Sequence, residues 1–324
     1  MNSLSSVEAF EAVFKPTLSC FSTLAIATEI GLLLYLRRPW NYKSRAVSAA
    51  CFVVTSVAGG LFHLTVAYHV HAFVWQYRLF DLGFAWYAWV ICFLLIDAMF
   101  YVTHRMHHRV RLLWCVHHVH HSAEEFELIT GIRGSFLDTA TQFPVYAWLP
   151  LIGVHPLMYL VTDTAFKFMI FIYHTEFIGK LGVFEHVFVT PSAHRVHHGK
   201  NVAYLDRNYG GVLIWLDKVL GTYHSEQERP TYGVLNNTAT YNIIRTQAGA
   251  FTDLWRDIAA APSWKSKLLY AFNPPGWRHD GPGNTSEELR LRSSPPPTSH
   301  APALEAAGGV GLTDKEHASA ARCA

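Results

Sequence analysis

The feature that most constrains the fold of this chain is a series of long apolar runs. Residues 17–36 read TLSCFSTLAIATEIGLLLYL with one charged side chain, Glu29, and residues 46–66 and 83–101 are similarly apolar. About 20 such residues are enough for a helix to cross a bilayer. We therefore predict three membrane-spanning helices. The first is an uncleaved span, because Glu8 and Glu11 precede it where a signal peptide would carry basic residues.

Two further apolar segments are less regular. Residues 136–154 contain Asp138 and Pro144, and residues 156–173 contain Asp163 and Lys167. They are expected either to span the membrane as a tight pair or to dip into it and return, with their charged side chains facing protein. The predicted fold is all-α, an integral membrane helical bundle of about four to five membrane segments, with a cytoplasmic, histidine-rich helical cap.

Charge and cysteine content exclude several other classes of protein. Of the 324 residues, 51% are hydrophobic and 15% are charged, and the net charge is +2. That balance argues against a nucleic-acid binder, which needs a basic face. The five cysteines are odd in number and widely spaced, so they predict neither a disulfide framework nor a CxxC metal site. Cys115 lies among histidines, but a packing role is the better expectation.

Basic residues predict the orientation of the bundle. Arg37, Arg38, Lys43 and Arg45 follow the first apolar run, which places that loop in the cytoplasm. Counting the later segments from there puts every histidine cluster on the same cytoplasmic side. We expect N-terminal membrane spans over residues 1–80, a catalytic domain over residues 81–283 and a disordered tail over residues 284–324, which is rich in Pro, Ser, Ala and Gly.

The histidines carry the chemical signal. The chain has twenty of them, and many recur at helical offsets of three and four residues, which place side chains on one helix face. Eight or nine imidazoles are too many for one ion and suit two. Neutral imidazoles fit iron, zinc or copper, and iron is the choice if dioxygen is activated, because zinc has no redox chemistry. The candidate ligands are His104, His108, His117, His120, His121, His194, His197 and His198, with His174 as a ninth.

Other histidines are expected to have ordinary roles. His107 and His118 neighbour the candidate ligands but lie off the repeated pattern, and His155 is expected in a turn. Polar residues near the clusters are candidates to hold the imidazoles by their other nitrogen. These candidates are Asp97, Glu124, Asn201, Asp206 and Asn208. For Asp97 the alternative is a pairing with Arg105 or Lys167.

The runs HRMHH (104–108), HHVHHS (117–122) and TPSAHRVHHGKN (190–201) resemble the fatty acid hydroxylase and sterol desaturase superfamily. Within it, the stretch around His174-Thr175-Glu176 and the pair Tyr232-Gly233 are most similar to the alkylglycerol monooxygenase branch and its bacterial relatives. The resemblance covers roughly residues 80–280 and implies a membrane enzyme whose histidine-rich diiron centre uses dioxygen on lipid C–H bonds.

The resemblance implies hydroxylation of a sterol, an ether lipid such as an alkylglycerol, or a fatty acyl lipid. Desaturation on the same metal site is the alternative. A metal transporter is a further alternative of another class, and it predicts ligands along a path through the membrane. The expected partners are a lipid substrate, the membrane and an external electron donor, which could be tetrahydrobiopterin, a cytochrome or a ferredoxin. No nucleic-acid partner is expected.

Overall fold

The computed structural model describes residues 3–235 and 241–293, and this part of the chain is helical, without a strand. Three segments are long and apolar enough to cross a membrane, namely Ala12–Tyr35, Tyr42–Trp75 and Trp86–Arg109. They correspond to α1 (Ser3–Tyr35), to α2 (Tyr42–Phe62) continued through a π-helical turn (His63–Ala67) into α3 (Tyr68–Trp75), and to α4 (Trp86–Arg109). Three of the predicted spans therefore have the expected helical form.

The fourth predicted segment is different. Residues 136–154 form α7 (Asp138–Tyr146) and a separate 3-10 turn (Leu149–Ile152), and α8 (Pro156–Phe171) has only 16 residues. A helix of 16 residues rises about 24 Å, short of the roughly 30 Å hydrocarbon core. Pro144 and Pro150 remove N–H donors from this stretch and favour the interruption. The described residues therefore contain three candidate spans, and a pair of shorter segments that dips into the membrane and returns stays a prediction for α7 and α8.

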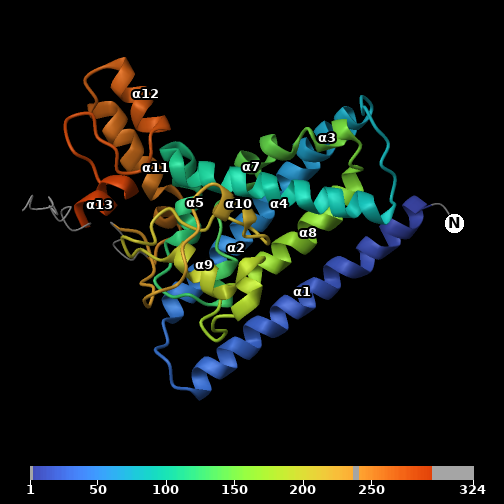
Figure 1. The fold of residues 1–324 in the computed structure, drawn as a ribbon, viewed down its shortest axis with the longest axis horizontal. Coiled ribbons are helices and arrows are strands. Elements are labelled where there is room, and N and C mark those ends of the chain that lie inside the picture. Colours follow the sequence, from blue (N-terminus) through green and yellow to red (C-terminus); the bar gives the residue numbers. More distant parts are fainter. Residues whose placement is uncertain (1–2, 236–240, 294–324) are drawn as a thin grey trace, which may run out of the picture.

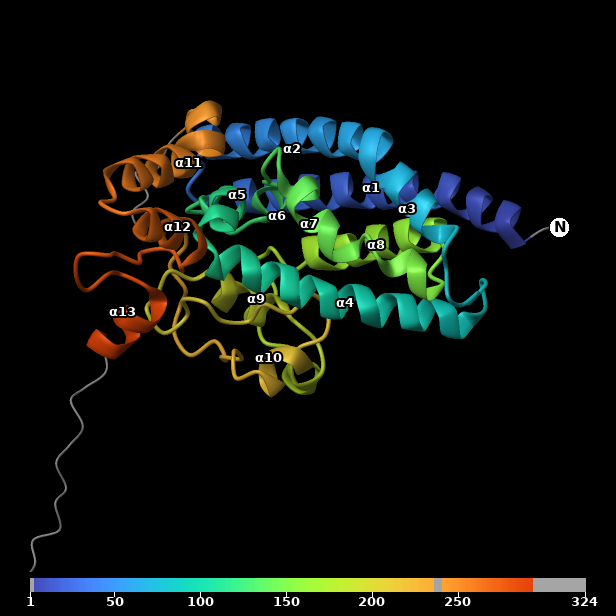
Figure 2. The same ribbon diagram turned by 90° about the horizontal axis from the view of Figure 1, so that it is seen from above.

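The long helices form a bundle, and the other elements form a cap over one end of it that extends along α4 (Figures 1 and 2). α4 packs against α8, and together with α7 these helices bury a core that includes Cys92, Ile96, Met158 and Phe166. The cap includes the end opposite the N-terminus and holds the remaining elements. These are α5 (Arg111–His121), α6 (Leu128–Gly131), a 3-10 turn (Gly182–His186), α9 (Pro191–His198), α10 (Trp215–Val219), α11 (Ile243–Ala260), α12 (Trp264–Phe272) and α13 (Ser286–Ser293).

Local sequence explains where several helices begin. Thr190 accepts the Ala193 N–H at the start of α9, and Pro191 occupies the first helical position, where a missing N–H has no effect. His155 caps α8 in the same way, by accepting the N–H of Leu157, which agrees with its predicted place in a turn. Cys115 is buried in a small core with Leu254, as expected for a packing residue.

The predicted tail begins with a helix. Thr285 and Glu288 form a reciprocal cap at the start of α13: the Thr285 N–H donates to Glu288 and the Glu288 N–H donates to Thr285 Oγ1. Arg290 then donates to the carbonyl of Leu205. The sequence TSEE at residues 285–288 carries this capping signal, and a prediction of disorder from composition does not take it into account. Residues 286–293 are therefore helical, and the rest of the predicted tail, with Cys323, lies outside the described residues.

Candidate metal centre

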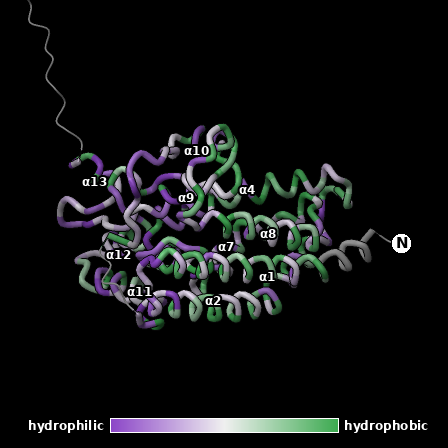
Figure 3. Tube along the Cα trace, turned by 90° about the horizontal axis from the view of Figure 1, so that it is seen from below, coloured by the Kyte–Doolittle hydropathy of each residue, from purple (hydrophilic) through white to green (hydrophobic). Residues whose placement is uncertain are grey.

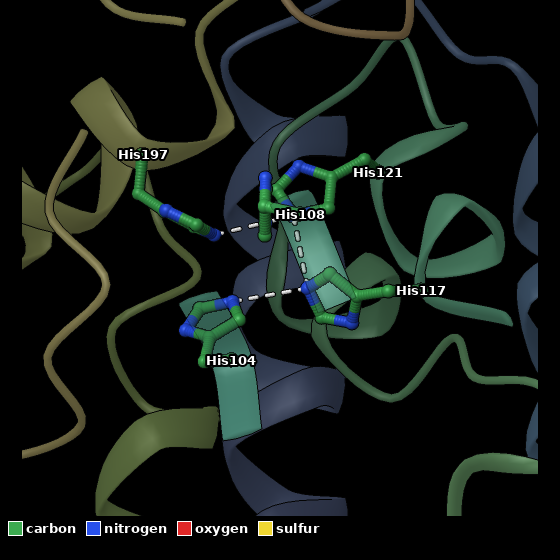
Figure 4. A group of neighbouring side chains, drawn as sticks. All are labelled: His104, His108, His117, His121 and His197. Atoms are coloured by element: carbon green, nitrogen blue, oxygen red, sulfur yellow. Dashed lines mark hydrogen bonds between the residues drawn. The ribbon is translucent and has the colours of Figure 1, made fainter. Parts of the chain in front are cut away.

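The structure brings all nine candidate histidines together in two adjacent groups. In each group one ring nitrogen per histidine lies within 4.8 Å of those of the other members. The first group is drawn in Figure 4. It contains His104, His108, His117, His121 and His197, and the second group contains His120, His174, His194 and His198.

Two short helices supply ligands to both groups. In α5, His117 and His121 are four residues apart and join the first group, while His120 points to the second. In α9 the arrangement is reversed, since His194 and His198 join the second group and His197 the first. Each i, i+4 pair therefore shares a site, and the intervening histidine joins the other site. Because two short helices serve both groups, the two sites are neighbours.

The ring nitrogens have the spacing of ligands around an ion. In the first group, Nε2 of His117 lies 3.0 Å from Nε2 of His104 and 3.2 Å from that of His121 (Figure 4). In the second group, Nε2 of His174 lies 2.9 Å from Nε2 of His194. Two nitrogens at right angles around an ion with bonds of about 2.1 Å lie about 3.0 Å apart. The nine side chains therefore fit two metal ions.

The opposite ring nitrogens fix the tautomers. Nδ1 of His120 lies 3.0 Å from the carbonyl of Arg133, and Nδ1 of His174 lies 3.1 Å from the carbonyl of Ile170. A carbonyl only accepts, so Nδ1 carries the ring proton and Nε2 presents a lone pair. The Nε2 atoms of these two histidines nevertheless face each other at 3.2 Å. Two lone pairs at that distance repel unless a cation lies between them.

The first group has the same construction. Nδ1 of His104 contacts the carbonyl of Tyr209 and Nδ1 of His197 contacts the carbonyl of Arg207, both at 2.9 Å. His108 differs, because its Nδ1 lies 3.4 Å from a carboxylate oxygen of Asp206. Its Nε2 is buried without a hydrogen-bond partner. A buried nitrogen of this kind, directed among four other imidazoles, has the position of a metal ligand.

Burial keeps the imidazoles neutral. It lowers the pKa of His120 to about 4 and that of His174 to about 3, with the neighbouring imidazoles adding to the effect. For His117, His194 and His197 the same causes hold the pKa well below its ordinary value. An imidazole must be neutral to coordinate a metal, so these five histidines are in the ligating state at neutral pH.

Two of the predicted supporting residues lie at the site. Asp206 lies between His108 and Arg109, whose guanidinium is 3.1 Å from the carboxylate. Burial raises the pKa of Asp206, but the hydrogen bond from His108 and the nearby charges outweigh it and lower that pKa to about 2. Asn208 is fully buried and donates to the carbonyls of Ala193 in α9 and His224. It therefore anchors the helix that carries three candidate ligands.

The other predicted supporting residues have different contacts. Asp97 accepts the backbone N–H groups of Val212 and Leu213, while Lys167 pairs with Asp163 and Arg105 donates to a tyrosine hydroxyl. Among the described contacts Asp97 therefore holds neither an imidazole nor one of these two basic residues, because two N–H groups of the facing loop donate to its Oδ1. Asn201 holds residues 228–231, and Glu124 is exposed.

Histidines outside the two groups have structural roles. His107 is buried, and its ring nitrogens contact the carbonyl of Thr103 and the hydroxyl of Thr141, which links α4 to α7. Neither His107 nor His118 belongs to a metal group among the described residues.

Several residues that position the two histidine groups were not predicted from the sequence. Glu29, in α1, accepts the Leu128 N–H at 2.6 Å and the Thr175 hydroxyl at 2.8 Å, and so ties the first span to the segment next to His174. Its only sequence signal is that it is a lone acid in an apolar run. Gly131 is required by a close approach, because a Cβ there would lie 2.7 Å from the His174 ring.

Two buried ion pairs also hold the segments that carry the histidines. Arg195, between two candidate ligands in α9, pairs with Glu226 at 2.7 Å and also donates to the carbonyls of Thr175 and Ile178. Arg45 pairs with Glu127 just after α5. Their partners are 31 and 82 residues away, respectively, so local patterns do not predict them.

Comparisons with known proteins agree with this geometry. Residues 89–222 match the fatty acid hydroxylase family, and this range includes all nine histidines. This match supports the superfamily that the histidine motifs resemble. It is 35% identical to the alkylglycerol monooxygenase of Homo sapiens over 274 residues, which are 80% of this chain and 60% of that protein.

More distant relatives are also enzymes of lipids. The alkylglycerol monooxygenase of Xenopus tropicalis is 34% identical over 78% of this chain and 58% of its own length. The ornithine lipid hydroxylase of Rhizobium tropici is 32% identical over 130 residues, 39% of this chain and 38% of its own. This chain thus spans about 60% of the length of these two alkylglycerol monooxygenases. No solved structure matches it.

Proposed function

We propose that this protein is a membrane-bound diiron hydroxylase that inserts one oxygen atom of O2 into a C–H bond of a lipid. The observation that carries the proposal is the pair of adjacent groups of neutral histidines whose Nε2 atoms converge at 2.9–3.2 Å. The superfamily and the lipid-hydroxylating relatives support the same reaction class.

Iron is the metal that fits both the donors and the reaction. Nitrogen-only groups of five and four imidazoles disfavour calcium and magnesium, which need oxygen ligands. Zinc binds imidazole but cannot take part in electron transfer. Two iron ions, when bound, would supply the activation of dioxygen that oxidation of an unactivated C–H bond requires.

The protein's own contribution is to position neutral ligands in a dry site. Backbone carbonyls hold Nδ1 of four of the histidines and leave Nε2 free. Asp206 gives His108 a carboxylate partner, which makes that imidazole a stronger donor. Seven of the nine histidines are buried and His117 and His120 are partly buried, which limits the access of water to the centre and favours oxidation of the C–H bond of the substrate.

The substrate class follows from the relatives and the surroundings. The relatives with the widest coverage are named for alkylglycerols, so an alkylglycerol ether lipid is the first substrate to test, followed by fatty acyl lipids and sterols. Electrons must come from an external donor, and a reduced pterin such as tetrahydrobiopterin, a cytochrome and a ferredoxin are the classes to compare. We place the active site on the cytoplasmic face, as the basic residues after the first span favour.

The position of the ligands favours an enzyme over a metal transporter. The histidines of α4 lie in its last two turns, and the others lie in the cap beyond the spans. A transport path would distribute ligands along the membrane-spanning helices.

Isotope labelling tests the proposal directly. Membranes of a host lacking the gene, with and without this chain, are supplied with ¹⁸O2 and each candidate reductant, and their lipids are analysed by mass spectrometry. A hydroxylase yields a lipid, or its cleavage product, that carries ¹⁸O. Loss of two hydrogens without ¹⁸O would identify a desaturase. An unchanged lipid profile in an iron-loaded preparation would refute the proposal, and a variant with His120→Ala and His197→Ala serves as the inactive control.

A further inference from the structure

One apolar surface of the cap is not covered by protein. It is made by the 3-10 turn at Gly182–His186 and by α10, which flank the third histidine cluster in the sequence. Val183 and Val219 are 73% and 72% exposed. We define the apolar patch by its exposed large side chains, which are Val183, Phe184, Val187, Trp215, Val219 and Leu220.

The two segments form one surface. An isolated bridge joins Phe188 to Leu213, and the Ile214 N–H donates to the carbonyl of Val187 at 3.0 Å. Lys218 donates to the carbonyl of His186 at 2.8 Å. These contacts hold the 3-10 turn and α10 side by side, so the patch is continuous. Water-exposed surfaces of soluble proteins rarely gather so many large apolar side chains.

The attachment of the patch to α4 sets its depth. Asp97 accepts the N–H groups of Val212 and Leu213, and the Tyr101 hydroxyl lies 2.9 Å from that of Thr222. If the apolar part of α4 starts at Trp86, Asp97 is about 16 Å along the helix axis, within the roughly 30 Å hydrocarbon core. The segment that carries α10 is therefore fixed to α4 at the level of the bilayer. Figure 3 shows hydrophobic residues beside α10 and along α4.

The backbone of the patch suits a lipid environment. Irregular backbone is tolerated at membrane depth only where its polar groups are satisfied. Here the Val189 N–H donates to the carbonyl of Val212, and Asp97 satisfies two further N–H groups.

We infer that the apolar patch is embedded in the bilayer leaflet next to α4, so that the lipid phase extends to the segments on both sides of the third histidine cluster. This inference rests on the membrane insertion of the proposed function, and its occupant is phospholipid.

Spin labelling measures the environment of the patch. In a full-length chain with Cys20→Ser and Cys323→Ser, nitroxide labels are placed on V183C and V219C and the protein is inserted in phosphatidylcholine vesicles. V57C on α2 is the lipid reference, because Val57 is 58% exposed on a candidate span. R256C on α11 is the aqueous reference. Collision rates with oxygen, which concentrates in lipid, and with a water-soluble nickel chelate are compared, and thermal unfolding checks that each variant is folded.

The expected result is that V183C and V219C match V57C, with frequent oxygen collisions and few nickel collisions. A match to R256C would overturn the inference. Few collisions with either reagent would also overturn it, because they would indicate contact with a second chain. If V57C itself reports water, membrane insertion fails together with the patch, whereas failure at V183C and V219C alone leaves the proposed function intact.

Discussion

Asp206→Asn is the most informative single substitution, because Asp206 is the one residue whose carboxylate contacts a candidate ligand among the described contacts. Its oxygen lies 3.4 Å from Nδ1 of His108, and its side chain is 11% exposed. Asparagine keeps the size and removes the charge. His108 belongs to the five-histidine group, so the loss should affect that metal and spare the other.

The magnitude follows from the contacts of Asp206. Removing a partner of a metal-ligating histidine typically weakens metal binding by about 10-fold to 100-fold, or about 1.4 to 2.7 kcal/mol. The 3.4 Å contact is longer than a strong charge-assisted hydrogen bond, and Arg109 already offsets part of the carboxylate charge. We therefore expect about a tenfold loss of affinity at one of two sites.

The assay is a titration of ferrous iron against a competing chelator, with the purified protein in detergent. The native chain should bind two irons of similar affinity, and Asp206→Asn should bind one of them normally and one about tenfold more weakly. Asp253→Asn is the matched control, because Asp253 forms an exposed ion pair with Arg256 and belongs to neither histidine group. Unchanged affinity at both sites, or equal weakening of both, would refute the reasoning.

Three further substitutions test other parts of the centre. His120→Ala should reduce the iron content from two to one per chain, whereas His118→Ala should leave it at two, as elemental analysis would reveal; the same content in both variants would contradict the assignment. Gly131→Ala should weaken only the four-histidine site in the iron titration, because its Cβ would lie 2.7 Å from the His174 ring. Glu226→Gln should lower the stability by about 3 kcal/mol at pH 7, because it leaves Arg195 buried without its partner. Burial raises the pKa of Glu226, but the hydrogen bond and charge of Arg195 outweigh burial and hold that pKa below its ordinary value of 4.5. The ion pair therefore stabilises the fold above pH 4.5, and the difference in stability between the variant and the native chain should narrow in thermal unfolding as the pH falls below that value. A difference that is constant with pH would show that the charge of Glu226 is not involved.

The membrane-spanning helices illustrate what local sequence can predict. A span of apolar residues carries its own signal, because each helix satisfies its backbone internally and needs only length and hydropathy. The segment at residues 136–154 has a similar composition but is broken into α7 and a 3-10 turn. Its form depends on packing against α2 and α4, which hydropathy does not report.

The histidines divide in the same way. Helical periodicity, a local property, identified which imidazoles lie on one face, and all nine candidates lie in the two groups. The distribution between the groups depends on how α5 and α9 face each other, and this is a tertiary property. Sequence spacing alone could not assign His120 to one group and His121 to the other.

The residues that support the ligands were the least predictable. Asp206 lies 98 residues from His108, and Glu29 acts on Thr175, 146 residues away. The sequence by itself determined the number and type of candidate metal ligands, the apolar spans and the resemblance to the superfamily, because these follow from residue type and short-range spacing. Only the tertiary structure decided how the ligands are shared, which carbonyls and carboxylates hold them, and where an apolar surface is left exposed. These features depend on contacts between residues that are distant in the chain, and such contacts are set by the packing of the whole bundle.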